Sequence, residues 1–282
     1  EMEENDKYLS ELVDGKGQDE ASQILKRGLR QLIKNVKPTK DDMKEQKTVE
    51  KKLSKFLKKK LPFNISRVSA VAAYGQNTTL KGKRECDLAI AILDLPRTEH
   101  DSWLPTIVGT IKTLLNQRDK NETSLPPCSE FSTTSTTVNF RCADVDVVLM
   151  PINDWEKNGG FQALYQMSMK QSADVLAHYN NNVCELQSRF IAKQADKCKD
   201  LIRVVKKWSC DTEWSPGCKP SDYLLSLLVV QAYEIVQPEM CEQSSADLDV
   251  LLEMAEMVND SQLELSWDTD NYISAQYPRQ FF

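Results

Sequence analysis

The sequence predicts an α+β protein of two lobes, a mixed α/β core lobe with N-terminal helices at residues 1–155 and a helical lobe at 156–282. Two observations lead to this prediction. In the first half, helical spacing of apolar residues gives way to short apolar and β-branched runs that are typical of strands. From residue 160 onward, every apolar pattern has a spacing of three and four residues, which indicates helices only.

The expected elements follow in order. Helices are predicted at 5–36 and 44–60, and strands within 67–75, 86–95 and 135–151. The polar segment 116–136 is expected to be an exposed loop. The later helices are predicted within 161–179, 183–208, 221–236 and 246–258. A cleft between the two lobes is the default binding site.

Composition excludes several classes of protein. A chain of 282 residues with 40% hydrophobic and 28% charged residues is typical of a soluble globular protein. No stretch approaches the roughly 18 consecutive apolar residues that a membrane span needs, and the acidic start is unlike a signal peptide. We therefore expect a cytoplasmic monomer that does not contact membranes.

The eight cysteines are scattered along the chain, and only Cys210 and Cys218 are close together. Their spacing fits no zinc-ribbon or thioredoxin pattern, and two histidines are a poor supply for a zinc site. We expect reduced, mostly buried thiols.

Charge is spread unevenly around a net value of −6. Residues 34–60 are strongly basic, whereas 247–270 are acidic. The basic stretch has two interpretations. It is either a solvated lysine-rich helix face behind apolar residues that face a core, namely Val49, Leu53, Phe56 and Leu57, or a surface that also binds phosphates.

Glu85 and Asp87 lie at the start of an apolar strand and, being two residues apart, project from the same face. Asp144 and Asp146 share a face in the same way, and either would complete a trio if the two strands are neighbours. Three carboxylates suit magnesium, and two such ions activate a hydroxyl and neutralise the phosphates of a nucleoside triphosphate. The alternative is that these strand-end acids are merely solvated.

Three motifs resemble the 2′-5′-oligoadenylate synthases, in the order in which that family carries them. They are "GQNTTLKGKRECDLAIAI", "CELQSRFIAKQADKCKDLIRVVKKW" and "KPSDYLLSLLVVQAYE". The similarity runs from about Val68 to Glu234. It implies a bilobal polymerase-β-like nucleotidyltransferase, related also to the cyclic GMP-AMP synthases.

The resemblance implies roles for individual residues. Glu85 and Asp87 would bind two Mg²⁺ ions, and Asp146 would be the third metal ligand and help to activate the acceptor 2′-hydroxyl. Arg203 and Lys206, three apart on one helix, would grip the triphosphate of ATP, with Leu201, Val204, Val205 and Trp208 packed behind. Without the resemblance, the simplest interpretation of Arg203 and Lys206 is a solvated basic helix face.

Tyr223 occupies the family position whose ring stacks on adenine, although a core aromatic at a helix start is the alternative. The Gly75 and Gln76 pair stands where the family has a Gly-Ser turn that cradles the triphosphate, and the loop after it is shorter. Glu85 replaces the usual first aspartate, as it does in the cyclic GMP-AMP synthases. The chain also stops at "QYPRQFF", where family members continue into a further strand.

The family is activated by double-stranded RNA, which proteins recognise through phosphates and 2′-hydroxyls. Arg189, Lys193 and Lys197 recur every four residues and would line one helix face as an RNA contact. The interspersed Asp196 and Asp200 make a solvated amphipathic face the alternative.

The sequence therefore predicts a template-independent enzyme that makes 2′-5′-linked oligoadenylates from ATP, activated by double-stranded RNA in innate antiviral sensing. Two alternatives stay open. One is a cyclic-dinucleotide synthase, suggested by the pair of Glu85 and Asp87. The other is a catalytically silent RNA-binding pseudoenzyme, suggested by the altered turn at Gln76.

Overall fold

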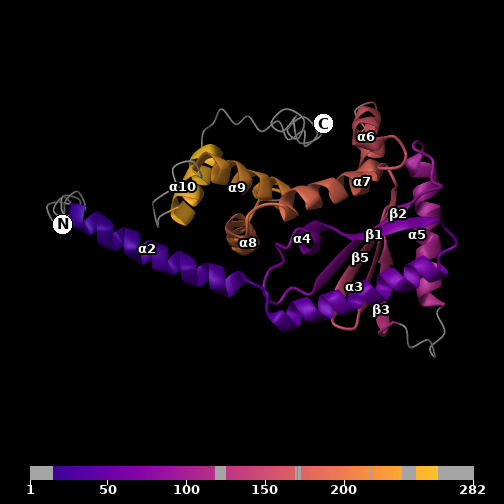
Figure 1. The fold of residues 1–282 in the computed structure, drawn as a ribbon, viewed down its shortest axis with the longest axis horizontal. Helices are drawn as coiled ribbons and strands as arrows, with labels where there is room; N and C mark the ends of the chain where they lie inside the picture. The colour runs from indigo at the N-terminus through magenta and orange to yellow at the C-terminus, as the bar shows by residue number, and fades with distance from the viewer. Residues whose placement is uncertain are drawn as a thin grey trace. The chain divides into compact units, whose positions relative to one another are not determined.

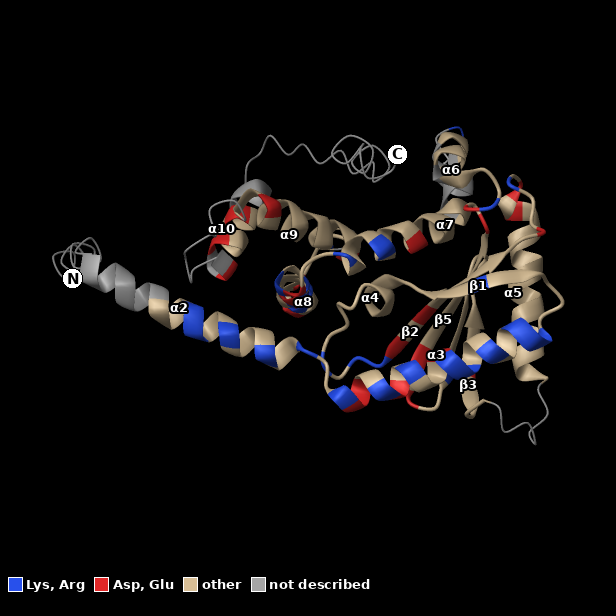
Figure 2. Ribbon diagram, viewed as in Figure 1, with Lys and Arg blue, Asp and Glu red and all other residues tan. Residues whose placement is uncertain are grey.

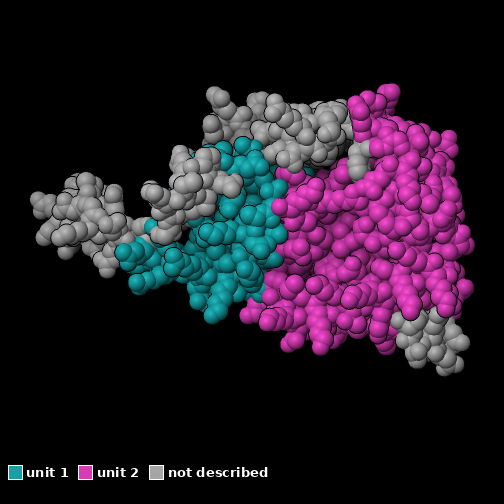
Figure 3. All heavy atoms as spheres, in the orientation of Figure 1, with its two compact units in different colours: residues 1–37, 194–263 teal, residues 38–193, 264–282 magenta. Residues whose placement is uncertain are grey.

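A computed structural model describes residues 15–117, 125–168, 170, 173–215, 218–236 and 246–259. The chain forms two compact units, each built from separate stretches of sequence (Figures 1 and 3). One comprises residues 38–193 with 264–282, and the other comprises 1–37 with 194–263. The two lobes predicted at 1–155 and 156–282 stay a prediction, and the compact units do not follow that boundary.

The larger unit contains a five-stranded sheet in the order β1-β2-β5-β4-β3. β2 and β5 run parallel to each other, and the other neighbouring pairs are antiparallel. This mixed sheet confirms the α+β class. The strands are β1 (Ile65–Ala70), β2 (Glu85–Ile92), β3 (Cys128–Thr133), β4 (Val138–Cys142) and β5 (Val145–Asn153).

Helices α3 (Lys40–Lys60) and α5 (His100–Asn116) contribute apolar side chains to the main core on one face of the sheet. Thr39 and Asp42 form a capping box that starts α3. The four apolar residues predicted to face a core are buried, as expected: Val49, Leu53, Phe56 and Leu57. Lysines recur along the rest of this helix (Figure 2).

The short helix α4 (Ala72–Gly75) and the long helix α7 (Ala173–Ala192) contact each other, and both contact strands of the sheet. Small residues on this second face, Ala89 and Ala91, pack with Val71 and the half-buried Cys184. Helix α6 (Gly160–Ser168) precedes α7. Trp155, Leu164 and Tyr179 form a separate apolar cluster.

The smaller unit is helical in its described residues. It contains α2 (Gly15–Val36), α8 (Asp196–Asp211), α9 (Asp222–Val236) and α10 (Ala246–Asn259). Nearly the whole length of α9 from Leu224 to Tyr233 is buried. Within the described ranges, no helix combines the length and apolarity needed to cross a membrane.

The structure corrects three expectations about elements. The predicted strand 67–75 ends at Ala70 and continues into α4. The predicted loop 116–136 contains the edge strand β3, whose side chains are mostly exposed and therefore lack the apolar pattern of a buried strand. The predicted helix 183–208 is two helices, because α7 ends at Ala192 and α8 begins at Asp196. The predicted start of the first helix, at residues 5–14, lies outside the described residues.

The cysteines that the structure describes are all free thiols. Cys86, Cys142 and Cys198 are buried, whereas Cys210 and Cys218 are exposed. The expectation of reduced thiols therefore holds for these seven residues, although only three are fully buried.

Candidate active site

Two strands bring the predicted acids together. The parallel register of β2 and β5 places Glu85 directly opposite Asp146, and the Asp146 N–H donates to the Arg84 carbonyl at 2.8 Å. Because paired residues project from the same face, Glu85, Asp87 and Asp146 share one side of the sheet, opposite the buried Cys86. The condition for an acidic trio, that the two strands are neighbours, is met.

The environments of these acids differ. Burial, together with the neighbouring charge of Glu85, raises the pKa of Asp87 to about 7. Asp146 is 76% exposed, and its Oδ1 lies 3.9 Å from the Arg141 Nε. Contrary to the prediction, Asp144 does not share a strand face with Asp146, because it lies in the turn between β4 and β5. It is equally exposed and lies 3.8 Å from Arg84, which also pairs with two carboxylates of α3. Each of the two aspartates therefore has an arginine at a similar distance, and the feature that distinguishes Asp146 is its position on β5 directly opposite Glu85.

The donor chemistry fits magnesium, since carboxylate oxygens are its preferred protein ligands. The side chains as they stand do not yet converge. Within the described part of the chain, no three His, Cys, Asp or Glu side chains are grouped closely enough to hold a metal ion. Asp146 would have to turn from Arg141 towards Glu85 to join such a site.

The raised pKa of Asp87 predicts a pH-dependent stability. The folded state holds this proton more tightly than the unfolded state does, so the free energy of unfolding should fall as pH rises from about 4 to about 7. A bound divalent cation should oppose the fall, because it favours the ionised carboxyl group. Urea unfolding at pH 5 and pH 8, with and without Mg²⁺, measures both effects. Asp87→Asn should lose this component of the slope and its response to Mg²⁺, and an unchanged slope would contradict the assignment.

The turn after β1 has the close packing expected of a phosphate cradle. At Gly75, a Cβ atom would lie 2.3 Å from the carbonyl oxygen of Ala70, so only glycine fits. Gln76 is buried, and its Oε1 accepts a hydrogen bond of 3.2 Å from the Thr78 hydroxyl. The glutamine that replaces the expected serine is thus part of the hydrogen bonding within the turn.

Helix α7 supports this turn from the second face of the sheet. The Ser188 hydroxyl accepts from the Ala72 N–H at 2.8 Å and donates to the Cys184 carbonyl at 2.7 Å. Ala72 has a φ of 51°, an unusual value for a residue with a side chain. The hydrogen bond from Ser188 therefore helps to hold a strained entry into α4.

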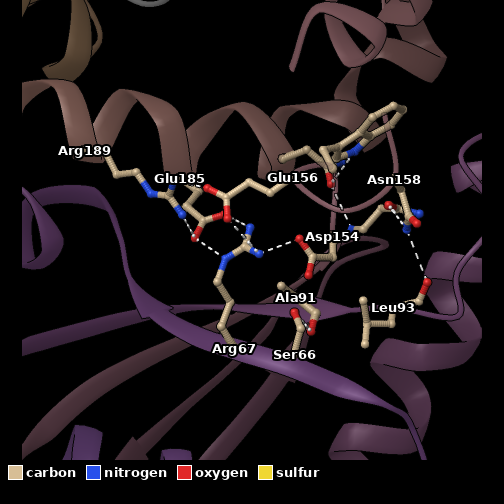
Figure 4. A network of polar contacts seen from close by, with 12 residues as sticks. Ser66, Arg67, Ala91, Leu93, Asp154, Glu156, Asn158, Glu185 and Arg189 are labelled. Atoms are coloured by element: carbon tan, nitrogen blue, oxygen red, sulfur yellow. Dashed lines mark hydrogen bonds and ion pairs between the residues drawn. The ribbon is translucent and has the colours of Figure 1, made fainter. Parts of the chain in front are cut away.

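A network of ion pairs ties α7 to β1 and to the end of β5 (Figure 4). Arg67 binds Glu185 through two nitrogens, at 2.8 and 2.7 Å, and Asp154 through Nη1 at 2.5 Å. Glu185 and Asp154 are almost fully buried. Burial raises the pKa of Glu185, but hydrogen bonds from Arg67 and Ser69, together with the charges of Arg67 and Arg189, outweigh it and leave the pKa below its ordinary value.

The predicted phosphate-binding pair lies on α8 in the smaller unit. Arg203 is 8% exposed, and its Nη1 lies 2.6 Å from Asp200. Burial lowers the pKa of Arg203 despite this carboxylate. Lys206 is 2% exposed, so the two residues do not form a solvated basic face. Their role towards ATP stays a prediction.

The surroundings of that pair partly match expectation. Leu201, Val204 and Val205 are buried, as predicted. Trp208 was expected to pack with them, but it is 49% exposed and contacts Trp214 edge to face. Tyr223 is half-buried in the first turn of α9, and its stacking role stays a prediction.

The predicted RNA contacts do not share one helix face. Arg189 lies on α7, Lys193 follows the end of that helix, and Lys197 lies on α8 in the other compact unit. The four-residue spacing is interrupted because the helix stops at Ala192. Lys193 and Lys197 are exposed, whereas Arg189 is paired with Glu156 and Glu185. Those carboxylates offset the charge that Arg189 would offer to a phosphate.

Several residues near the acids were missed from the sequence. Helix α7 is held in place by Ser188, which binds Ala72, and by Glu185, which binds Arg67. Helix α3 contacts the start of β2 through Gln46 and the glycine turn through the hydrogen bond between Glu50 and Tyr74. One signal was available. Gln46 precedes Val49 by three residues, so it continues the buried stripe of its helix and needs a polar partner.

Comparison with known proteins finds similarity to the same family as the motifs did. Residues 159–278 match the family model described as 2′-5′-oligoadenylate synthetase 1, domain 2, C-terminus. The chain is also similar to 2′-5′-oligoadenylate synthase 2 of Mus musculus, with 24% identity over 192 residues. That match covers 64% of this chain and 24% of the mouse protein, so the chain spans about a quarter of its curated relative.

Solved structures share the fold. The crystal structure of mtPAP in complex with ATPγS has a TM-score of 0.51 and 11% identity, and covers 76% of this chain and 42% of that chain. The structure of CdnC from E. coli MS115-1 with ATP has a TM-score of 0.50 and 14% identity, and covers 82% and 71%. The predicted polymerase-β-like nucleotidyltransferase fold is confirmed, as is the resemblance to the 2′-5′-oligoadenylate synthases.

Proposed function

Because this chain is similar to the 2′-5′-oligoadenylate synthases and has a polymerase-β-like nucleotidyltransferase fold, we propose that it transfers adenylyl groups from ATP to a 2′-hydroxyl and releases pyrophosphate. The observation that carries the proposal is the parallel register of Glu85 with Asp146, with Asp87 two residues further along the same face. This arrangement provides a row of carboxylates at a strand mouth, beside a turn that only glycine can form.

Each group has a part in the proposed reaction. Glu85, Asp87 and Asp146 hold two Mg²⁺ ions, which supply charge neutralisation and hydroxyl activation when bound. Asp146 accepts the proton of the acceptor hydroxyl, since it is the most exposed of the three. The turn at Gly75 and Gln76 is assigned to the triphosphate, although the N–H groups of both residues donate within the turn, to the Val71 and Ala72 carbonyls at 2.9 Å.

Three residues of the smaller unit have proposed roles towards the nucleotide. Arg203 offers a planar fork and Lys206 a point charge for triphosphate oxygens, and Tyr223 stacks on the adenine. Both basic residues are buried, and Arg203 pairs with Asp200 at 2.6 Å, so a phosphate would share Arg203 with that carboxylate.

Double-stranded RNA is the proposed activator, in a cytoplasmic antiviral response. The exposed Lys193 and Lys197 and the lysines that recur along α3 support this part of the proposal (Figure 2). Phosphate contacts of this kind weaken with salt, because each one releases counterions from the duplex.

Product identity tests the proposal. The protein is incubated with ATP and Mg²⁺, with and without a long RNA duplex, and the products are digested with a nuclease that cleaves only 3′-5′ linkages. We expect resistant oligoadenylates, with more formed when duplex is present. Nuclease-sensitive oligomers would contradict the 2′-5′ linkage, and equal rates with and without duplex would contradict RNA activation.

The same reaction with ATP and GTP together tests the alternative of a cyclic-dinucleotide synthase, which the glutamate at position 85 favours. Cyclic dinucleotides in place of oligomers would establish that activity. Binding of duplex RNA with no nucleotide turnover would instead identify a pseudoenzyme.

Replacement of Arg203 and Lys206 by alanine should weaken ATP use far more than replacement of Lys207. The first two are buried, while Lys207 is exposed and pairs with Asp211 at 2.6 Å. We expect at least a tenfold rise in the KM for ATP for each buried residue, about 1.4 kcal/mol of binding. Steady-state kinetics with Lys207→Ala as control measures this, and equal effects at all three positions would indicate only a general electrostatic field.

A further inference from the structure

Helix α3 carries a polar stripe, Asp42, Gln46 and Glu50, that contacts the start of β2 and the turn before it. The three residues are four apart and so follow one side of the helix. Asp42 is 6% exposed, Gln46 is 1% exposed and Glu50 is half-buried. Buried polar groups are destabilising unless they are hydrogen-bonded, so the partners of this stripe are informative.

Gln46 contacts the start of β2. Its Nε2 donates to the Glu85 carbonyl at 2.9 Å and lies 3.4 Å from the Lys83 carbonyl. A fixed carbonyl holds the Glu85 backbone in place, and with it the point from which the carboxylate side chain extends. Gln46 thus acts on the backbone of a proposed metal ligand.

Glu50 contacts the glycine turn. Its Oε2 accepts a hydrogen bond of 2.5 Å from the Tyr74 hydroxyl, and Tyr74 immediately precedes Gly75. Burial, with a further contribution from Glu50, raises the pKa of Tyr74. The hydroxyl therefore stays protonated and continues to donate this bond throughout the neutral range.

Asp42 contacts Arg84, the residue whose backbone links the start of β2 to Asp146 on β5. It accepts from Arg84 Nε at 3.3 Å, and the Arg84 carbonyl accepts the N–H of Asp146 at 2.8 Å. One helix face therefore reaches the first metal-binding strand, the second strand and the turn between β1 and β2.

We propose that Gln46 and Glu50 are positioning residues for nucleotide transfer, with Gln46 orienting Glu85 and Glu50 orienting the Gly75 turn through Tyr74. Neither residue touches the reacting atoms in this assignment. The inference rests on the proposed function, and it adds that two different steps depend on one helix. Gln46 acts on the transfer step and Glu50 on nucleotide binding.

A double-mutant cycle tests the Glu50 part. Glu50→Gln, Tyr74→Phe and the double variant are compared with the wild type in steady-state kinetics and in calorimetric binding of ATP with Mg²⁺. We expect the KM and the Kd for ATP to rise about tenfold in each single variant, with kcat within about twofold, because only the turn has shifted. The double variant should be no worse than either single variant, since both remove the same hydrogen bond.

Gln46→Met tests the other part, because methionine keeps the volume and removes both donors. We expect kcat to fall about tenfold and the Kd for ATP to stay within about twofold. Mg²⁺ binding measured by calorimetry should weaken as well. Gln46→Asn, whose amide is too short to reach the Glu85 carbonyl, should behave in the same way if the methionine variant does not fold. Thr48→Ala is the control, since Thr48 is exposed on the same helix and its hydroxyl donates only to the Lys44 carbonyl.

The outcomes separate this inference from the function on which it rests. A wild-type protein that transfers nucleotides, with variants that match it in kcat, KM and both binding constants, overturns the positioning roles alone. If the wild type binds ATP without turnover, the positioning roles are tested by binding alone. The Kd for ATP of Tyr74→Phe and the Mg²⁺ affinity of Gln46→Met then show whether each role holds. A wild type that neither binds nor transfers nucleotides overturns both. Equal losses in kcat and KM for Gln46→Met and Glu50→Gln would show a general loosening of α3 and contradict the separate roles.

Discussion

Asp146→Asn should abolish nucleotide transfer, with a loss of at least a thousandfold in kcat, while the free energy of unfolding changes by less than about 0.5 kcal/mol. Asparagine keeps the size and shape of the side chain but removes the charge that a divalent cation needs and the basicity that an acceptor hydroxyl needs. Little stability is at stake because the carboxylate is 76% exposed. Steady-state kinetics and urea unfolding on the same preparation measure the two effects.

Asp144→Asn is the matched control, because Asp144 is equally exposed and two residues away, but lies in the turn before β5 and not opposite Glu85. We expect its activity to stay within a few fold of the wild type. Comparable inactivation would show that the wrong member of the pair was assigned. Full activity of Asp146→Asn would remove this residue from the site. The proposed metal site would then have no carboxylate from β5.

The alternation of acidic and apolar residues made the acid face predictable. The pattern from Glu85 to Ile92 predicts which side chains enter the core, and the buried Cys86, Leu88 and Ile90 confirm it. The pairing of Glu85 with Asp146 needed one more fact, that β2 and β5 are neighbours. Strand order depends on the packing of the whole sheet, so only the family resemblance pointed to it.

Local patterns failed where distant residues decide the outcome. The spacing of Arg189, Lys193 and Lys197 suggests one continuous helix, but the chain breaks after Ala192 and resumes at Asp196. Nothing local shows that Arg189 meets Glu156, 33 positions away. The contact between Glu50 and Tyr74 is equally invisible in the sequence, because it joins a helix to a turn 24 residues later.

Arg67→Met should be the most destabilising substitution of an ionic residue in the larger unit, lowering the free energy of unfolding by about 3–5 kcal/mol at pH 7. Arg67 neutralises two buried carboxylates at once, Glu185 and Asp154 (Figure 4). Its loss would leave both charges in a poorly solvated site. Glu185→Gln should cost less, about 2 kcal/mol, since it removes one charge and keeps a hydrogen-bonding group. Lys207→Met is the control, because an exposed pair contributes at most about 1 kcal/mol.

The pH dependence of these variants distinguishes an ion pair from simple packing. The pKa of Glu185 is below its ordinary value of 4.5 in the folded state, so its contribution is present above that pH and is lost as pH falls through the folded pKa. The stability difference between wild type and Glu185→Gln should therefore shrink in acid. A difference that stays constant from pH 7 to pH 3 would show that the substitution acts through packing.

Because α7 also carries Ser188, which holds the turn at Ala72, loss of Arg67 should weaken ATP binding as well as stability. An Arg67→Met protein with full stability and normal ATP affinity would mean that α7 needs no ionic anchor to hold the site.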